Sequence, residues 1–537
     1  MPMDAGELGH VELILLLLLV LVAALAVLAK RLHVAYPIVV VLGGLALSLL
    51  PGVPRVSLNP NVVFLVILPP LLFSAAFHTS WRDFLDNLVS ILMLAFGLVG
   101  FTIYGVASTT RLLLPGFDWK LGLVLGAVVA TTDAIAATAT AKRLGLPRRI
   151  TDLLEAESLV NDGSGLVALK FTLPMVVMGV TPSVLLGVGT LLYLILVAVF
   201  IGIAVGFIID RIQRRIVDAP VEITISLITP FVAYLGAEWL QCSGVLATLA
   251  CGIYLGRRSS GHYSLHARIE STAFWRTLDF ILNGLVFLLL GLQLPAILSQ
   301  ITGYSVLQLV IDGAAFSGIV IMLRLLWVYP GAWISRHIRH RILRKEYQNT
   351  SPRSIFLVGW AGMRGVLALA AALSLPEKLH NGAPFPQRSL IIFLTFSVIF
   401  ATLVLQGLTM PALIRRLGLA GTSAGYEEEL VARKQMILSA LQALAEIRAR
   451  GPEEERGVYD QLEWHYRRRL ASIDKESAER PRQAQKIDHQ LFVAQELRDV
   501  ERAVALQLRD KNQIHDEVLR RLEHELDLLD ARFAESE

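Results

Sequence analysis

The sequence predicts an all-α, polytopic membrane protein with a helical, soluble C-terminal tail, and three observations support this fold class. Of its 537 residues, 54% are hydrophobic and only 18% are charged, against roughly 45–50% and 25% in soluble domains. Apolar blocks follow one another from residue 11 to about residue 413. Beyond residue 425 the chain is densely charged and has no apolar run of membrane length. We therefore expect a membrane domain over residues 1–415 and a cytoplasmic helical domain over residues 416–537.

The apolar blocks have the lengths of transmembrane helices. A helix rises about 1.5 Å per residue, so about 20 apolar residues cross the hydrocarbon core of a bilayer. Thirteen segments are predicted to span on this basis: 11–29, 34–50, 61–77, 87–107, 121–141, 151–178, 184–209, 221–239, 243–256, 273–297, 306–334, 353–374 and 389–413.

Loop charges predict the orientation of these spans. With thirteen spans and a cytoplasmic C-terminus, the N-terminus lies outside, and most loop lysines and arginines then fall on the cytoplasmic side. Positive loops are retained on that side of a cell membrane. We expect a multi-pass protein of the cell membrane that is in contact with the lipid bilayer.

Two aspartates are predicted to lie at the same depth in the membrane. Asp133 falls near the middle of the fifth span and Asp162 near the middle of the sixth, which runs in the opposite direction. A charge at this depth costs several kcal/mol or more and usually marks a transport or relay site. Ser158 lies four residues before Asp162 and shares its helix face. A hydroxyl and a carboxylate are hard oxygen ligands suited to a small cation, although a buried polar cluster that only ties helices together is the alternative.

A neighbouring face of the sixth span carries a second polar pair, Glu157 and Asn161. A buried Glu157 needs a cationic partner, and a structural ion pair is the favoured interpretation of this residue. Arg364, in the middle of the twelfth span, is the expected counter-ion because a guanidinium can bind a carboxylate through two hydrogen bonds. Arg324 is a second intramembrane arginine, and the sequence does not identify its partner.

The fifth and twelfth spans have the composition of interrupted helices. Threonine and alanine surround Asp133, while Gly359, Gly362 and Gly365 surround Arg364. The two spans are seven apart and therefore run in opposite directions, as an inverted repeat requires. Paired discontinuous helices with charges at mid-depth are typical of secondary transporters. Glycines that only allow tight helix packing are the alternative.

Four motifs carry a resemblance to a known family. They are Pro69-Pro70-Leu71-Leu72-Phe73, Thr132-Asp133, Glu157-Ser158-x-x-Asn161-Asp162-Gly163 and Gly362-Met363-Arg364-Gly365. Together they resemble the monovalent cation–proton antiporters of the NhaP/NHE type, over residues 11–413. The resemblance implies exchange of a monovalent cation for H⁺ by a homodimer, with the two discontinuous helices crossing beside the ion site. Na⁺ is the expected cation, with Li⁺ or K⁺ as alternatives.

The resemblance also implies roles for single residues. Asp162 would bind the cation or the proton, with Asp133 and Ser158 as further ligands of the monovalent ion. Thr132 and Asn161 would lie beside them, and the Asn161-Asp162 pair resembles the electroneutral form of the family. Glu157 and Arg364 would form the structural ion pair, and Arg324 and Ser74 are accessory candidates.

Two positions depart from the family pattern. Ala134 stands where the family usually has a proline, which predicts a less sharply broken fifth helix. Ser74 stands where an acidic residue often follows the Pro-Pro run, which would remove an accessory ligand.

Other classes of function fit the sequence less well. A pH-gated or ligand-gated cation channel or sensor on the same helical bundle is the alternative to exchange. We do not expect an enzyme or a cofactor, because the sequence contains no HExxH metal-binding pattern. The mixed charges of the tail argue against binding of nucleic acid. The last tail helix is predicted to carry a narrow apolar seam over residues 519–533.

Overall fold

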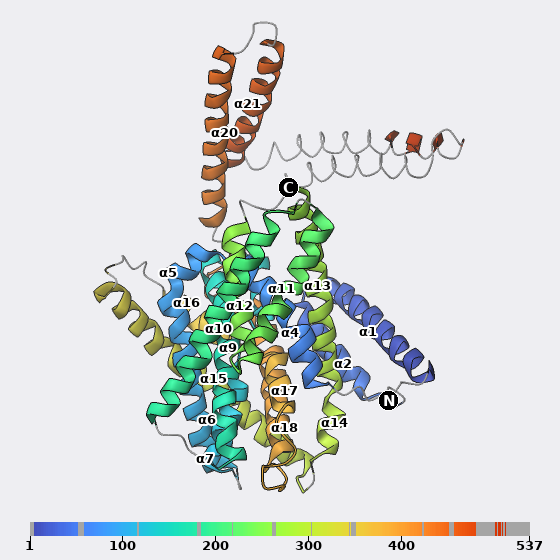
Figure 1. Ribbon diagram of the computed structural model, residues 1–537, viewed down its shortest axis with the longest axis vertical. Coiled ribbons are helices and arrows are strands. Elements are labelled where there is room, and N and C mark those ends of the chain that lie inside the picture. The colour runs from blue at the N-terminus through green and yellow to red at the C-terminus, as the bar shows by residue number, and fades with distance from the viewer. Residues whose placement is uncertain are drawn as a thin grey trace. The chain divides into compact units, whose positions relative to one another are not determined.

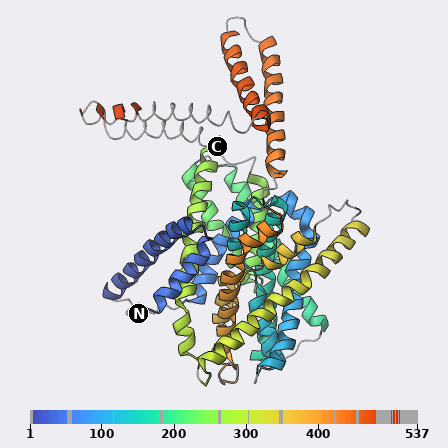
Figure 2. The same cartoon turned by 180° about the vertical axis from the view of Figure 1, so that it is seen from behind.

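The computed structural model shows a helical chain that divides into two units, Met1–Thr422 and Ser423–Glu537. The structure describes residues 5–51, 58–114, 117–179, 184–216, 218–259, 265–301, 303–342, 344, 351–420, 424–450 and 456–478, and eight positions between 500 and 511. Two opposite views show how the helices of each unit are arranged (Figures 1 and 2).

The first four spans of the first unit comprise eight helical segments. They are α1 (Ala5–Leu32), α2 (Tyr36–Ser48), α3 (Pro60–Val62), η1 (Val63–Ile67), α4 (Leu68–His78), α5 (Trp81–Leu92), η2 (Met93–Leu98) and α6 (Val99–Leu113). The η segments have π-helical geometry, which often accompanies a local distortion at a functional position. η1 precedes Pro69 and Pro70, which lack the N–H groups that regular helical pairing with the preceding turn would use.

The middle of the unit contains the first interrupted helix, which consists of α7 and α8. The segments of this part are α7 (Trp119–Ala130), α8 (Ile135–Arg143), α9 (Arg148–Val177), α10 (Val184–Gln213), α11 (Ala219–Trp239) and α12 (Gly244–Ser259). The remaining segments are α13 (Leu265–Leu292), α14 (Leu294–Ser299), α15 (Val306–Arg341), α16 (Pro352–Trp360), α17 (Val366–Leu373), α18 (Arg388–Ala401), η3 (Thr402–Gln406) and α19 (Gly407–Arg416).

Each of the thirteen predicted spans overlaps one or more of these segments, so the predicted fold class is confirmed. Within the described residues, nine helical stretches are long and apolar enough to cross a membrane. The other four predicted spans correspond to the short helices α2 and α12, the charge-bearing α9, and the interrupted pair α16–α17. The chain is a multi-pass membrane protein.

Burial separates the rim of the unit from its centre. Only 17% of the apolar stretch in α1 and 22% of that in α10 is buried, although both are strongly hydrophobic. The stretch that contains α7 and α8 is 78% buried. Exposed apolar side chains such as Leu16 and Phe200 suit contact with lipid. The interrupted fifth span therefore lies in the protein interior, where irregular backbone can be satisfied by neighbouring helices.

The second unit begins with a helical hairpin. α20 (Ala424–Arg450) and α21 (Arg456–Ala478) pack side by side (Figure 1). Arg448 near the end of α20 pairs with Asp460 at 2.8 Å and with Glu463 at 3.0 Å on α21. The seam predicted over residues 519–533 lies outside the described residues.

Candidate functional site

The fifth span is broken for four residues between α7, which ends at Ala130, and α8, which begins at Ile135. Ser158 on α9 satisfies two backbone groups of the break: its Oγ donates to the carbonyl of Thr132 at 2.7 Å and accepts from the N–H of Ala134 at 3.2 Å. The expectation that Ala134 would leave this helix less sharply broken is wrong, because these bonds replace those of a continuous helix.

The twelfth span is broken between α16, which ends at Trp360, and α17, which begins at Val366. The two breaks meet, since the N–H of Asp133 donates to the carbonyl of Met363 at 2.8 Å. Two discontinuous helices therefore cross at their breaks, as predicted.

Arg364 lies in the second break and is almost fully buried. Its Nη1 donates to the carbonyls of Ala130 at 3.2 Å and Thr131 at 3.3 Å, at the C-terminal end of α7. The last carbonyls of a helix lack partners within it and carry partial negative charge. The backbone N–H of Arg364 donates to Thr402 Oγ1 at 3.0 Å. Arg364 therefore caps the first half of the other broken helix.

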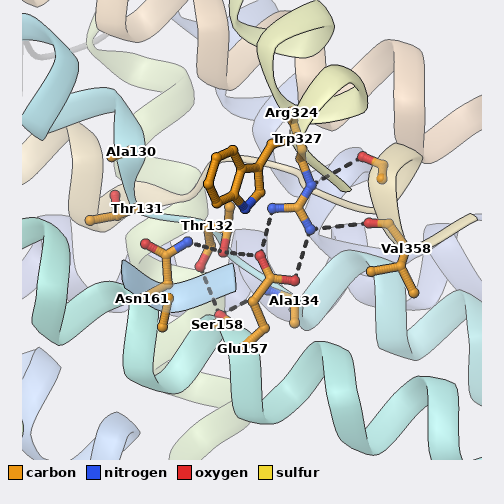
Figure 3. A network of polar contacts seen from close by, with 12 residues as sticks. Ala130, Thr131, Thr132, Ala134, Glu157, Ser158, Asn161, Arg324, Trp327 and Val358 are labelled. Atoms are coloured by element: carbon orange, nitrogen blue, oxygen red, sulfur yellow. Dashed lines mark hydrogen bonds and ion pairs between the residues drawn. The ribbon is translucent and has the colours of Figure 1, made fainter. Parts of the chain in front are cut away.

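The predicted ion pair between Glu157 and Arg364 is wrong, because Glu157 pairs with Arg324 (Figure 3). Arg324 Nη1 and Nη2 donate to the two carboxylate oxygens of Glu157 at 2.6 and 2.8 Å. Arg324 also donates to the carbonyls of Gly359 at 3.0 Å and Val358 at 3.1 Å, which lie in the last turn of α16. Both charged side chains are 2% exposed. This arginine ties α9, α15 and α16 together.

Thr132 and Asn161 extend this network towards the break (Figure 3). Asn161 Nδ2 donates to Thr132 Oγ1 at 3.0 Å, and that hydroxyl donates to Glu157 Oε1 at a long 3.5 Å. Asn161 is fully buried and is absent from the cavity described next. Asn161 Nδ2 thus makes a structural contact, whereas its Oδ1 is buried without a hydrogen-bond partner among the described residues, and the place of Asn161 beside the ion stays a prediction.

A cavity of about 240 Å³ lies beside the first break. Asp133, Ser158 and Asp162 line it together, with apolar side chains from η1, α4, α13 and α17. The carboxylate of Asp162 receives no hydrogen bond from the described residues. One water takes about 30 Å³, so the cavity has room for a cation and several waters. The three ligands predicted from the sequence are therefore brought to one cavity.

Asp133 is held firmly at this cavity. Its Oδ1 accepts a hydrogen bond from the N–H of Ile135 at 2.8 Å, at the start of α8. Its other oxygen, Oδ2, faces Gly365, where an added Cβ would lie only 2.5 Å away. The absence of a side chain at Gly365 therefore sets the space that the Asp133 carboxylate occupies.

Replacing Gly365 with alanine is expected to lower the transport rate at least about tenfold and to destabilise the protein by roughly 1–3 kcal/mol, as overpacking does. The new methyl group would displace the Asp133 carboxylate or separate the two breaks. Transport in vesicles and thermal unfolding in detergent measure the two effects. Gly318→Ala on α15 is the control, because its Cβ would meet no atom within 4 Å. A Gly365→Ala protein with wild-type transport would contradict this prediction.

Sequence reasoning missed a third carboxylate at the cavity, that of Asp279 on α13. Ser74 on α4, one of the accessory candidates, donates from its Oγ to Asp279 Oδ2 at 2.6 Å. The signal was present in the sequence, since Asp279 is an acidic residue within the tenth predicted span. Among the described residues no three His, Cys, Asp or Glu side chains lie close enough together to hold one metal ion. Asp279 therefore does not join Asp133 and Asp162 around a single point.

Comparisons with known proteins identify the family of this chain. An uncharacterized Na⁺/H⁺ exchanger of Mycobacterium bovis is 34% identical over 513 residues, which cover 94% of this chain and 92% of the relative. A sodium, potassium, lithium and rubidium/H⁺ antiporter of Bacillus subtilis is 33% identical over 422 residues, covering 76% of this chain and 61% of that protein.

The fold is similar to that of a solved structure, the sodium proton antiporter MjNhaP1 from Methanocaldococcus jannaschii at pH 8. The TM-score is 0.59 at 18% identity, over 76% of this chain and 99% of that one. The family model for the transmembrane part of sodium/hydrogen exchangers matches residues 15–416. The chain belongs to the sodium/hydrogen exchanger family.

Proposed function

We propose that this protein exchanges a monovalent cation for H⁺ by competition of the two ions at Asp162. The observation that carries the proposal is the cavity in which the carboxylate of Asp162, without a hydrogen bond from the described residues, lies with Asp133 and Ser158 beside two crossed helix breaks. Their oxygens are hard ligands of the kind that small cations prefer. Na⁺ is the cation we propose first, and Li⁺ and K⁺ are the alternatives.

The coupling follows from the cost of a buried charge. An ionised carboxylate without a bound ion is disfavoured within the membrane. The site at Asp162 therefore changes its access from one side of the membrane to the other only when it holds a cation or a proton. Because the two ions occupy the same group, binding of one excludes the other. The exchange is electroneutral in this scheme, since one positive charge crosses in each direction.

Two further features belong to the proposal. We expect the protein in the plasma membrane, with its N-terminus outside the cell and its C-terminal unit in the cytoplasm. In this orientation the loops richest in lysine and arginine lie on the cytoplasmic side. We also expect a homodimer, as the resemblance to NhaP/NHE antiporters implies.

Purified protein in proteoliposomes loaded with a pH-sensitive dye tests the proposal. Addition of Na⁺, Li⁺ or K⁺ in turn is expected to move protons with saturable dependence on the cation. In the pH range where protons occupy the site, lowering the pH by one unit should raise the apparent KM for the cation about tenfold at an unchanged maximal rate, because the proton concentration rises tenfold.

The same vesicles separate exchange from the channel alternative. An electroneutral exchanger should show the same rate when a membrane potential is imposed with K⁺ and valinomycin. A channel would instead carry a current that follows the imposed potential. A potential-driven, non-saturating flux, or a KM that does not change with pH, would contradict competition at a single group.

A further inference from the structure

α13 presents two polar side chains to the ion cavity, Asp279 and Asn283. They are four residues apart and so lie on one helix face, as Ser158 and Asp162 do on α9. α13 packs against α1, α2, α4, α11 and α17, and α17 also packs against α7. The cavity is thus lined by oxygen-bearing side chains from α13 as well as from α9 and the break after α7.

The carboxylate of Asp279 is only half satisfied. Its Oδ2 accepts the 2.6 Å hydrogen bond from Ser74, which fixes the orientation of the group. Its Oδ1 is buried and has no hydrogen-bond partner among the described residues. A buried acceptor without a partner costs free energy, and a bound cation would remove that cost.

The arginines of the site do not supply the missing partner. Arg324 is engaged by Glu157 and by the end of α16, and Arg364 by the end of α7. Asp279 also does not lie close enough to the other acidic side chains to share one metal ion with two of them. Its buried Oδ1 is therefore available to a ligand of its own.

We infer that Asp279 and Asn283 form a second binding station for a monovalent cation, distinct from the Asp162 station in the same cavity. The inference rests on the proposed exchange function and adds a second place in the same cavity where the cation binds. Ser74 is a positioning residue that orients the Asp279 carboxylate. A third carboxylate also makes the cavity more negative and so raises the local concentration of cations.

Asp279→Asn tests the station, because the amide oxygen can still accept the hydrogen bond from Ser74 while the charge is lost. We expect the KM for Na⁺ in proteoliposomes to rise about tenfold or more, with a maximal rate within about twofold of wild type, since a unit charge at contact distance is worth at least this factor. Asp312→Asn on α15 is the matched control, because Asp312 does not line the cavity. Its KM should equal that of the wild type.

A double variant guards against a purely structural effect. Ser74→Asp combined with Asp279→Ser moves the carboxylate across the 2.6 Å contact and restores a hydroxyl–carboxylate pair. The double variant should recover most of the affinity for Na⁺ that Asp279→Ser alone loses. An unchanged KM in Asp279→Asn, or a double variant no better than Asp279→Ser, would overturn the second station.

Asp162→Asn, measured in the same vesicles, distinguishes failure of the second station from failure of the proposed function. Loss of exchange in Asp162→Asn together with a wild-type KM in Asp279→Asn would contradict the second station alone. Wild-type exchange in Asp162→Asn would contradict the proposed function, whatever Asp279→Asn shows.

Discussion

Replacing Asp162 with asparagine is expected to abolish cation-dependent proton movement at every pH and with every cation. An amide neither ionises nor takes up a proton in this range, so neither ion can be exchanged for the other. Because the carboxylate of Asp162 accepts no hydrogen bond from the described residues, the substitution removes no hydrogen bond. Dye dequenching in inverted vesicles measures the effect.

Stability provides the control for this variant. Replacing a buried carboxylate that makes no hydrogen bond to the described residues should leave the thermal unfolding midpoint close to that of the wild type. A loss of transport that accompanies normal folding then assigns the defect to ion binding. Residual exchange above that of empty vesicles in a correctly folded Asp162→Asn protein would refute competition at this group.

Replacing Glu157 with glutamine is expected to destabilise the membrane domain by roughly 3–5 kcal/mol, the usual cost of breaking a buried ion pair. Arg324 would keep its charge in a site where its own side chain is only 2% exposed. Thermal unfolding in detergent, followed by size-exclusion chromatography, measures the loss. The double variant with Glu157→Leu and Arg324→Met should be more stable than Glu157→Gln, because it leaves no unpaired charge in the interior.

The exposed ion pair between Lys170 and Glu238, at 2.8 Å, is the matched control. Glu238→Gln should cost less than about 1 kcal/mol, as exposed pairs usually do. The double variant at Glu157 and Arg324 should not regain full stability, because Arg324 also binds the carbonyls of Gly359 and Val358. Equal stability of Glu157→Gln and Glu238→Gln would show that the buried pair does not hold the domain together.

The position of the two aspartates in the membrane could be predicted from the sequence alone. Span lengths fix depth to within about a helical turn, and successive spans alternate in direction, so Asp133 and Asp162 had to lie at a similar level. The division of α9 into two polar faces also followed from helical periodicity. The structure confirms that Ser158 and Asp162 face the cavity while Glu157 faces Arg324.

The choice of arginine could not be predicted in the same way. Arg324 and Arg364 both lie deep in the membrane, and depth alone does not tell which of them meets Glu157. The choice depends on which face α15 turns towards α9, and on the non-helical backbone that directs Arg364 to the end of α7. Asp279 could have been found as an acidic residue within the tenth predicted span, whereas its contact with Ser74 depends on how α13 packs against α4, which no local pattern encodes.

The crossed breaks have a consequence for how the chain is assembled during synthesis. Arg364 satisfies the carbonyl of Ala130 from a position 234 residues further along the chain. At about 5–20 residues per second, the ribosome needs roughly 10 to 50 seconds to supply it. During this interval the end of α7 is inserted without its cap, so the nascent protein is expected to depend on the insertion machinery until α16 and α17 arrive.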